Sequence, residues 1–207
     1  MTDKIVPQEQ TTTDVLAWHF LRSNELANGD KRKVIVGETL TVSTPVVLCS
    51  SGLHASKRVI DALSYAPGAI CCRVRLSGEI VEGDDKLAAS ERTVIAMIDA
   101  TDVLRAFSRW CALEVAHLWD MPPIVRQYLE TGDESIRAAA RAAAWTAWDA
   151  TWDAARAAAW DAARAAAWDA ARAAARAAAW AAARAAKIEE FNIKLESMLL
   201  EAMGVTQ

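Results

Sequence analysis

Hydrophobic and polar residues alternate in short runs through the first half of the chain, and turn residues separate these runs. In the clearest run, 70–76, every second residue from Ile70 to Leu76 falls on one face of a strand. We expect that face in the core, and the opposite face then presents Arg73 and Arg75. Shorter runs predict further strands at 15–21, 34–36, 39–42, 46–49 and 93–98.

A helical spacing of apolar residues appears between and after these strands. Ser56 is the expected N-cap of a helix that runs to about Tyr65. Apolar stripes also predict helices over 103–119 and 124–130. The fold class is therefore α+β. We expect a disordered lead at 1–13, a small mixed α/β head at 14–100 and a helical connector at 101–133.

The last third of the chain has a different pattern. Residues 134–203 contain no glycine or proline, and their most frequent residue is alanine, which has the highest helix propensity. We expect one long Ala-rich helix within 134–207, about 105 Å long if unbroken, since each residue adds about 1.5 Å.

A four-residue repeat runs along this helix, because every fourth residue from Trp148 to Arg184 is Trp or Arg. A four-residue step advances the helix by about 40° beyond a full turn, so the bulky stripe winds around the rod and does not stay on one seam. Burying the indoles then needs neighbours on several sides, which favours a homo-oligomeric helical bundle, a trimer or larger. The predicted oligomerisation residues are Trp145, Trp148, Trp152, Trp160, Trp168, Trp180, Arg156, Arg164 and Arg172. The alternatives are a lone solvated helix and a repeat that expanded without a selected role.

Charge and cysteine usage narrow the possible partners. Residues 1–133 hold 14 Lys and Arg against 18 Asp and Glu, and residues 134–207 hold 9 against 9, so nucleic acid is not an expected partner. Charged residues interrupt the apolar tracts, and the polar start is not a signal peptide, so we expect no membrane span. The four cysteines lack metal-site spacing. We interpret them as reduced, which favours a cytoplasmic location and predicts neither metal nor cofactor.

One candidate ligand site emerges in the head. His54 follows a Ser-Ser-Gly turn and precedes the expected helix N-terminus at Ser56, where free N–H groups favour an anion. The predicted ligand-binding residues are His54, Lys57, Arg73, Arg75 and Tyr65. The alternative is a solvated loop histidine among surface cations. We interpret His19 and His117 as core residues. Nucleophile–base, P-loop and dinucleotide motifs are absent from the sequence, so we predict no catalytic residue.

Several segments together resemble an uncharacterised family of small bacteriophage and prophage proteins. They are CSSGLHAS at 49–56, LSG at 76–78, DKLA at 85–88, WDMPPIVRQYLETGD at 119–133 and the Ala/Arg/Trp tail. The resemblance covers most of the chain and implies a phage-encoded protein that acts in the host cytoplasm. It implies no particular activity.

The head also resembles ADP-ribosyltransferase folds, which carry a histidine on an early strand and a strand–helix unit. His19 and the segment 52–65 fit those positions. The catalytic glutamate of such enzymes has no clear counterpart, since Glu91 and Glu114 match its position poorly. The resemblance therefore implies a related fold that binds an ADP-ribose-like molecule without turning it over.

These observations predict a phage-encoded, oligomeric, non-catalytic binding protein. Its ligand would be a nucleotide-like host signal, such as ADP-ribose or a cyclic nucleotide, or a host protein. One alternative is an ADP-ribosyltransferase-like or nucleotide-processing enzyme. Another is a structural or assembly protein.

Overall fold

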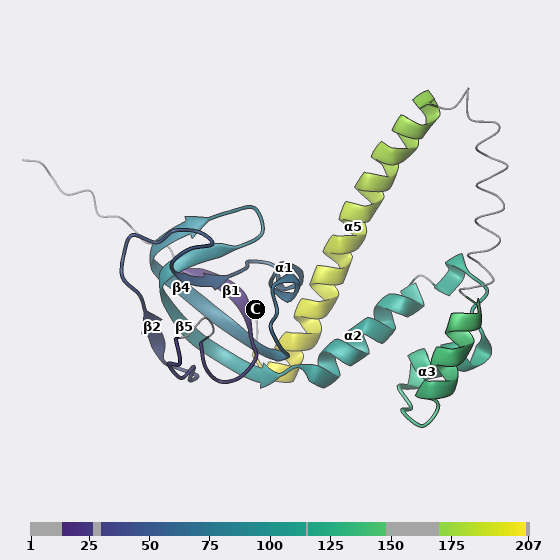
Figure 1. Ribbon diagram of the computed structural model, residues 1–207, viewed down its shortest axis with the longest axis horizontal. Coiled ribbons are helices and arrows are strands. Elements are labelled where there is room, and N and C mark those ends of the chain that lie inside the picture. Colours follow the sequence, from purple (N-terminus) through teal and green to yellow (C-terminus); the bar gives the residue numbers. More distant parts are fainter. Residues whose placement is uncertain (1–13, 27–29, 115, 148–169, 206–207) are drawn as a thin grey trace, which may run out of the picture. The chain divides into compact units, whose positions relative to one another are not determined.

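A computed structural model of the 207-residue chain describes residues 14–26, 30–114, 116–147 and 170–205 (Figure 1). For Leu118 and for residues 170–183 it describes the backbone alone. The predicted lead at 1–13 lies outside the described residues. Contacts divide the described part into two compact units, one within Met1–Thr101 and Leu199–Gln207 and the other within Asp102–Met198.

The first unit contains a five-stranded antiparallel sheet, so the expectation of an α+β chain is confirmed. The strands are β1 (Val15–Leu21), β2 (Thr39–Thr41), β3 (Leu53–Ala55), β4 (Ile70–Glu82) and β5 (Leu87–Asp99). Their order is β1-β4-β5-β2, and β3 also pairs with β5.

A long hairpin of β4 and β5 organises this sheet. Each strand has 13 residues, and the Gly83 N–H closes the turn by donating to the Lys86 carbonyl at 2.9 Å. The register shifts between Arg73 and Val74 and again between Ser77 and Ile80. Such bulges bend a strand and increase its twist. Strand β3 pairs with residues 87–89 of β5, and β2 pairs with residues 91–93 of β5. The two short strands therefore pair with successive parts of β5.

The predicted inner face of β4 is confirmed, because Cys72, Val74 and Leu76 are fully buried. Residues of β1, β2, β3 and β5 complete this core: Ala17, Leu21, Leu40, Leu53, Ala55, Leu87, Ala89 and Val94. The prediction that the opposite face presents Arg73 to solvent is wrong. Arg73 is buried, and its guanidinium lies 4.5 Å from the ring centre of Trp18.

The helix after β3 begins later than the sequence suggested. Helix α1 spans Val59–Ser64, and its N-cap is Arg58 rather than Ser56. Ser56 continues the extended chain because its backbone exchanges two hydrogen bonds with Trp18, at 2.8 and 2.9 Å. The strands predicted at 34–36 and 46–49 are also wrong. Turn hydrogen bonds shape the second segment, where Ser50 and Ser51 donate to the Val47 carbonyl.

The second unit is helical. It contains most of α2 (Thr101–Glu114), the 3-10 helix η1 (Ala116–Leu118), α3 (Pro123–Thr131) and most of α5 (Ala170–Met203). Helix α3 ends at Gly132, whose φ of 68° is the left-handed conformation that glycine adopts readily.

Both described ends of the Ala-rich tract are helical, at 137–147 and along α5. Residues 148–169, and with them most of the tryptophan repeat, lie outside the described residues. The side chains of Arg172 and Trp180 also lie outside them. Trp145 is 54% exposed in the single chain. One unbroken helix and an oligomeric bundle therefore stay predictions.

The C-terminal part of α5 packs on α2 of the same chain. The Phe191 ring meets Trp110 edge-on at 5.5 Å and Phe107 at 6.2 Å. Beside these rings, the Lys187 ammonium donates to Glu114 at 2.7 Å. Aromatic pairs of this kind contribute about 0.5–1.5 kcal/mol beyond their buried area.

Candidate functional site

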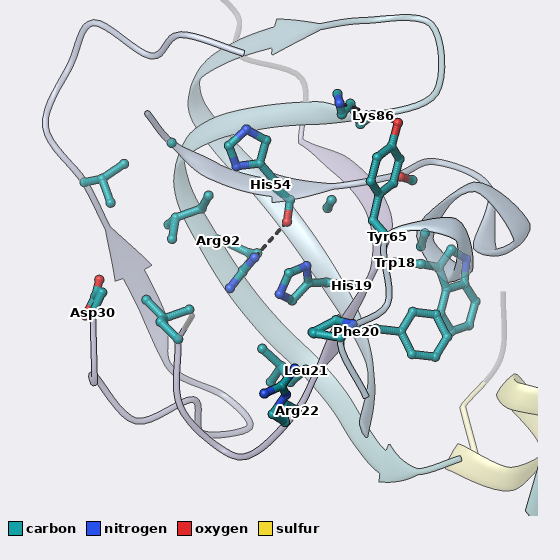
Figure 2. A pocket seen from close by; sticks show the side chains of 18 of the residues that line it. Trp18, His19, Phe20, Leu21, Arg22, Asp30, His54, Tyr65, Lys86 and Arg92 are labelled. Atoms are coloured by element: carbon teal, nitrogen blue, oxygen red, sulfur yellow. Dashed lines mark hydrogen bonds between the residues drawn. The ribbon is translucent and has the colours of Figure 1, made fainter. Parts of the chain in front are cut away.

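A pocket of about 850 Å³ opens in the sheet-containing unit. Five of the polar residues that line it come from separate elements: His19 on β1, His54 on β3, Tyr65 at the end of α1, Lys86 just before β5, and Arg92 on β5 (Figure 2). Arg22, Glu25 and Asp30 also line it. Ligand pockets in proteins commonly measure about 300–1,000 Å³. The volume therefore suits a ligand of nucleotide size.

Strand register places two of these residues on the core face of the sheet. His19 pairs with Cys72 and Arg92 pairs with Leu76, and both partners belong to the inner face of β4. Along β1, His19 therefore stands on the face of Ala17 and Leu21, where an apolar residue is the norm. Two polar side chains therefore occupy positions where apolar residues are usual.

Arg92 is the central feature of the pocket. It is 1% exposed, and its Nη1 donates to the His54 carbonyl at 2.8 Å. Its Nε and Nη2 are buried and have no hydrogen-bond partner in the described part of the chain. These two nitrogens form one edge of the guanidinium. Leaving two buried donors unpaired costs about 1–3 kcal/mol each, so this edge is a strong candidate for ligand contact.

Another arginine of this chain illustrates what that edge binds. Nε of Arg32 donates to both Asp30 oxygens at 3.0 Å, and its Nη2 donates to one of them at 2.7 Å. This side-on, two-pronged geometry matches carboxylates and phosphates. The partnerless edge of Arg92 therefore fits an oxyanion.

The pocket also carries unbalanced positive charge. Burial lowers the pKa of Arg92 to about 10, which still leaves the side chain protonated at neutral pH. Among the described residues two carboxylates line the pocket, but Glu25 pairs with Lys33 at 2.6 Å and Asp30 pairs with Arg32 at 2.7 Å. A buried charge without a counter-ion costs several kcal/mol, which a bound anion would offset.

Both histidines of the pocket are neutral near pH 7. Burial is the main cause that lowers the pKa of His19 well below 6.5, and the charge of Arg92 adds to it. Burial also lowers the pKa of His54, with smaller contributions from Lys86 and Arg92 and an opposing hydrogen bond to Gly52. Nε2 of His54 accepts the Cys49 N–H at 3.2 Å, which assigns the ring proton to Nδ1.

The structure brings two of the predicted ligand-binding residues into this pocket, His54 and Tyr65. His54 lies on strand β3 and not in a loop before a helix, because the chain stays extended through Ser56. Tyr65 donates from Oη to Asp85 at 2.6 Å at the pocket rim.

Lys57, Arg73 and Arg75 are not among the residues that line the pocket. Lys57 is exposed and pairs with Glu82. Arg73 stacks on Trp18, and Arg75 lies 3.7 Å from Asp14. The sequence grouping failed because Arg73 and Arg75 point to the side of β4 opposite its core face.

Sequence reasoning missed Arg92 and Lys86 and interpreted His19 as core. Arg92 precedes the predicted strand at 93–98 on the same face as Val94, so a cation at an apolar position of the alternation was the available signal. Lys86 sits in a turn, and no pattern in the sequence distinguishes it from a surface lysine.

The two glutamates compared with a transferase glutamate lie elsewhere. Glu91 accepts a hydrogen bond from Ser77 at 2.9 Å, and Glu114 pairs with Lys187 in the helical unit. Neither lines the pocket. Within the described residues, His, Cys, Asp and Glu form no group of three suited to hold a metal ion. No helix in the described ranges combines the length and apolar character needed to cross a membrane.

Comparison with known families gives one match. Residues 17–106 match a domain of unknown function, DUF7666. Every residue that lines the pocket falls inside this span, from Trp18 to Arg92, whereas the Ala-rich tract falls outside it. No curated protein and no solved structure matches the chain.

Proposed function

We propose that the head binds a small, oxyanion-bearing, nucleotide-like ligand and holds it without turnover. The observation that supports this proposal is the buried edge of Arg92, whose Nε and Nη2 have no hydrogen-bond partner in the described residues. A phosphate or carboxylate on this edge would gain two charge-assisted hydrogen bonds and neutralise the buried cation. The neutral imidazoles of His19 and His54 line the same space.

Binding without chemistry is supported by three of the four described pocket groups that could act as bases. Glu25 and Asp30 are held in ion pairs, and Nε2 of His54 is occupied by the Cys49 N–H, while the fourth group, His19, is a buried neutral imidazole. A general base needs a free acceptor within reach of the substrate proton. In the wider role we propose, an oligomer assembled through the Ala/Arg/Trp tract sequesters a nucleotide-like signal inside a phage-infected host cell.

Isothermal titration of the full chain with ADP-ribose, cyclic AMP and cyclic GMP tests the binding. We expect at least one of them to bind, and Arg92→Met to weaken that ligand by about 10- to 100-fold, since hydrogen bonds to a charged group contribute about 1.5–3 kcal/mol. The matched control is Arg75→Met, because Arg75 is an exposed arginine outside the pocket. The proposal would be overturned if none of the three ligands gave a heat of binding. It would also be overturned if Arg92→Met and Arg75→Met lost affinity equally.

A further inference from the structure

Besides Arg92, two cations among the described residues line the pocket, Arg22 and Lys86. The ammonium of Lys86 lies 4.6 Å above the ring centre of Tyr65 and 3.5 Å from its Oη. Tyr65 in turn donates to Asp85. These contacts place the ammonium at the rim, where the β4–β5 turn enters β5, and favour that position by about 0.5–1 kcal/mol.

Lys86 has no carboxylate within ion-pairing distance among the described residues. Nearby cations of the same unit do have one: Arg32 pairs with Asp30, Lys33 with Glu25, and Lys57 with Glu82. Lys86 and Arg22 therefore share with Arg92 the property of a positive charge that lines the pocket without a carboxylate in ion-pairing distance among the described residues. Of the two, only Lys86 contacts an aromatic ring of the pocket, that of Tyr65.

Of these cations, Arg92 and Lys86 flank one imidazole. Figure 2 shows Arg92 and Lys86 on different sides of His54, with Tyr65 beside Lys86. Both charges act on that ring, since each of them lowers the pKa of His54. A ligand that reaches from the buried edge of Arg92 toward the rim would thus pass His54 and arrive at Lys86.

We propose that the ligand carries two linked anionic groups, a diphosphate, one bound by the Nε–Nη2 edge of Arg92 and the other by the Lys86 ammonium. This inference rests on the proposed oxyanion site at Arg92. It favours a nucleoside diphosphate or a diphosphate-bridged molecule such as ADP-ribose over a cyclic nucleotide, which has a single phosphate. A free pyrophosphate shares the same chemistry.

Four probes separate these possibilities in titrations of the full chain at about 0.15 M salt. They are inorganic phosphate, pyrophosphate, AMP and ADP. We expect the wild type to bind pyrophosphate and ADP about fivefold or more tighter than phosphate and AMP, which is the effect of one partly exposed ion pair. If pyrophosphate binds more tightly than phosphate and ADP more tightly than AMP, the diphosphate is the group that is recognised. If ADP also binds more tightly than pyrophosphate, the protein contacts the nucleoside as well.

The variant Lys86→Met should remove most of this preference and leave phosphate and AMP affinities within about twofold. Lys57→Met is the control, since Lys57 is an exposed lysine of the same unit that does not line the pocket. Equal affinities for one and two phosphates in the wild type, with binding still lost in Arg92→Met, would overturn the diphosphate inference and leave the oxyanion site standing. Equal effects of Lys86→Met and Lys57→Met would overturn it as well. Binding of none of the four probes would overturn the diphosphate inference, and the absence of binding to ADP-ribose, cyclic AMP and cyclic GMP as well would overturn both proposals.

Discussion

Replacing Arg92 by methionine should make the ligand-free protein more stable. In the wild type, Nε and Nη2 are buried without partners, and each unpaired donor costs about 1–3 kcal/mol. Methionine fills a similar volume without polar hydrogens, but the His54 carbonyl then loses the Nη1 hydrogen bond of 2.8 Å. That loss costs about 1–3 kcal/mol. Removing the buried charge tips the balance, and we expect a net gain of about 1–3 kcal/mol in the free energy of unfolding.

Urea unfolding followed by circular dichroism measures this gain as a higher midpoint at unchanged slope. Adding ADP-ribose should then stabilise the wild type and not the variant, because a ligand stabilises only a state that binds it. Arg75→Met should change the stability by less than about 0.5 kcal/mol, as is usual for an exposed side chain. A loss of more than about 2 kcal/mol in Arg92→Met would show that Arg92 is a structural residue, and would refute the reasoning from its partnerless edge.

Three further outcomes follow from the described contacts and from the repeat. Because the pKa of His19 is lowered in the folded chain, the unfolded chain binds a proton at higher pH than the folded chain does. The free energy of unfolding should therefore fall as the pH drops below about 6.5. Urea titrations at several pH values should show this fall, and His19→Gln should make it smaller. Phe191→Ala should lower the free energy of unfolding by about 2–3 kcal/mol, because it removes both aromatic contacts. The control Ile193→Ala, at a position 61% exposed, should change the free energy little in thermal unfolding. Similar losses in both variants would contradict the packing described for α5. Light scattering should give the intact chain the mass of a trimer or larger, and Trp160→Ala combined with Trp168→Ala should reduce that mass; a monomeric intact chain would refute the oligomeric role of the repeat.

The regular part of the head could be predicted from the sequence. Strand β1 has the expected bounds, and the alternation in β4 correctly identified its buried face. In β4 the alternation of apolar and charged residues reflects the core face of the strand. Strand β1 was found for another reason, because it is a short apolar run whose residues on both faces, such as Trp18 and Leu21, are buried. Segments without such alternation were predicted less well. Val47 lies in a turn although its neighbours are apolar, because local hydrogen bonds to Ser51 decide its backbone.

The pocket could be predicted only in part. His54 was singled out for its place beside a turn, and it does line the pocket, although on a strand. The place of Arg92 in the pocket depends on the pairing of β5 with β4 and on the position of the His54 carbonyl, and both involve contacts between residues far apart in the sequence. Short-range patterns do not contain that information. The prediction of a helix N-terminus at Ser56 was wrong for the same reason, since backbone pairing with Trp18 overrides the capping preference of serine.

A crystal of the full chain soaked in tungstate would test the oxyanion site at Arg92 most directly, because tungsten scatters anomalously and marks the anion without ambiguity. We expect an ordered tungstate with oxygens within hydrogen-bond distance of both Nε and Nη2 of Arg92. An Arg92 edge that contacts a carboxylate or carbonyl of the protein itself, with tungstate bound elsewhere or nowhere, would contradict the proposed site.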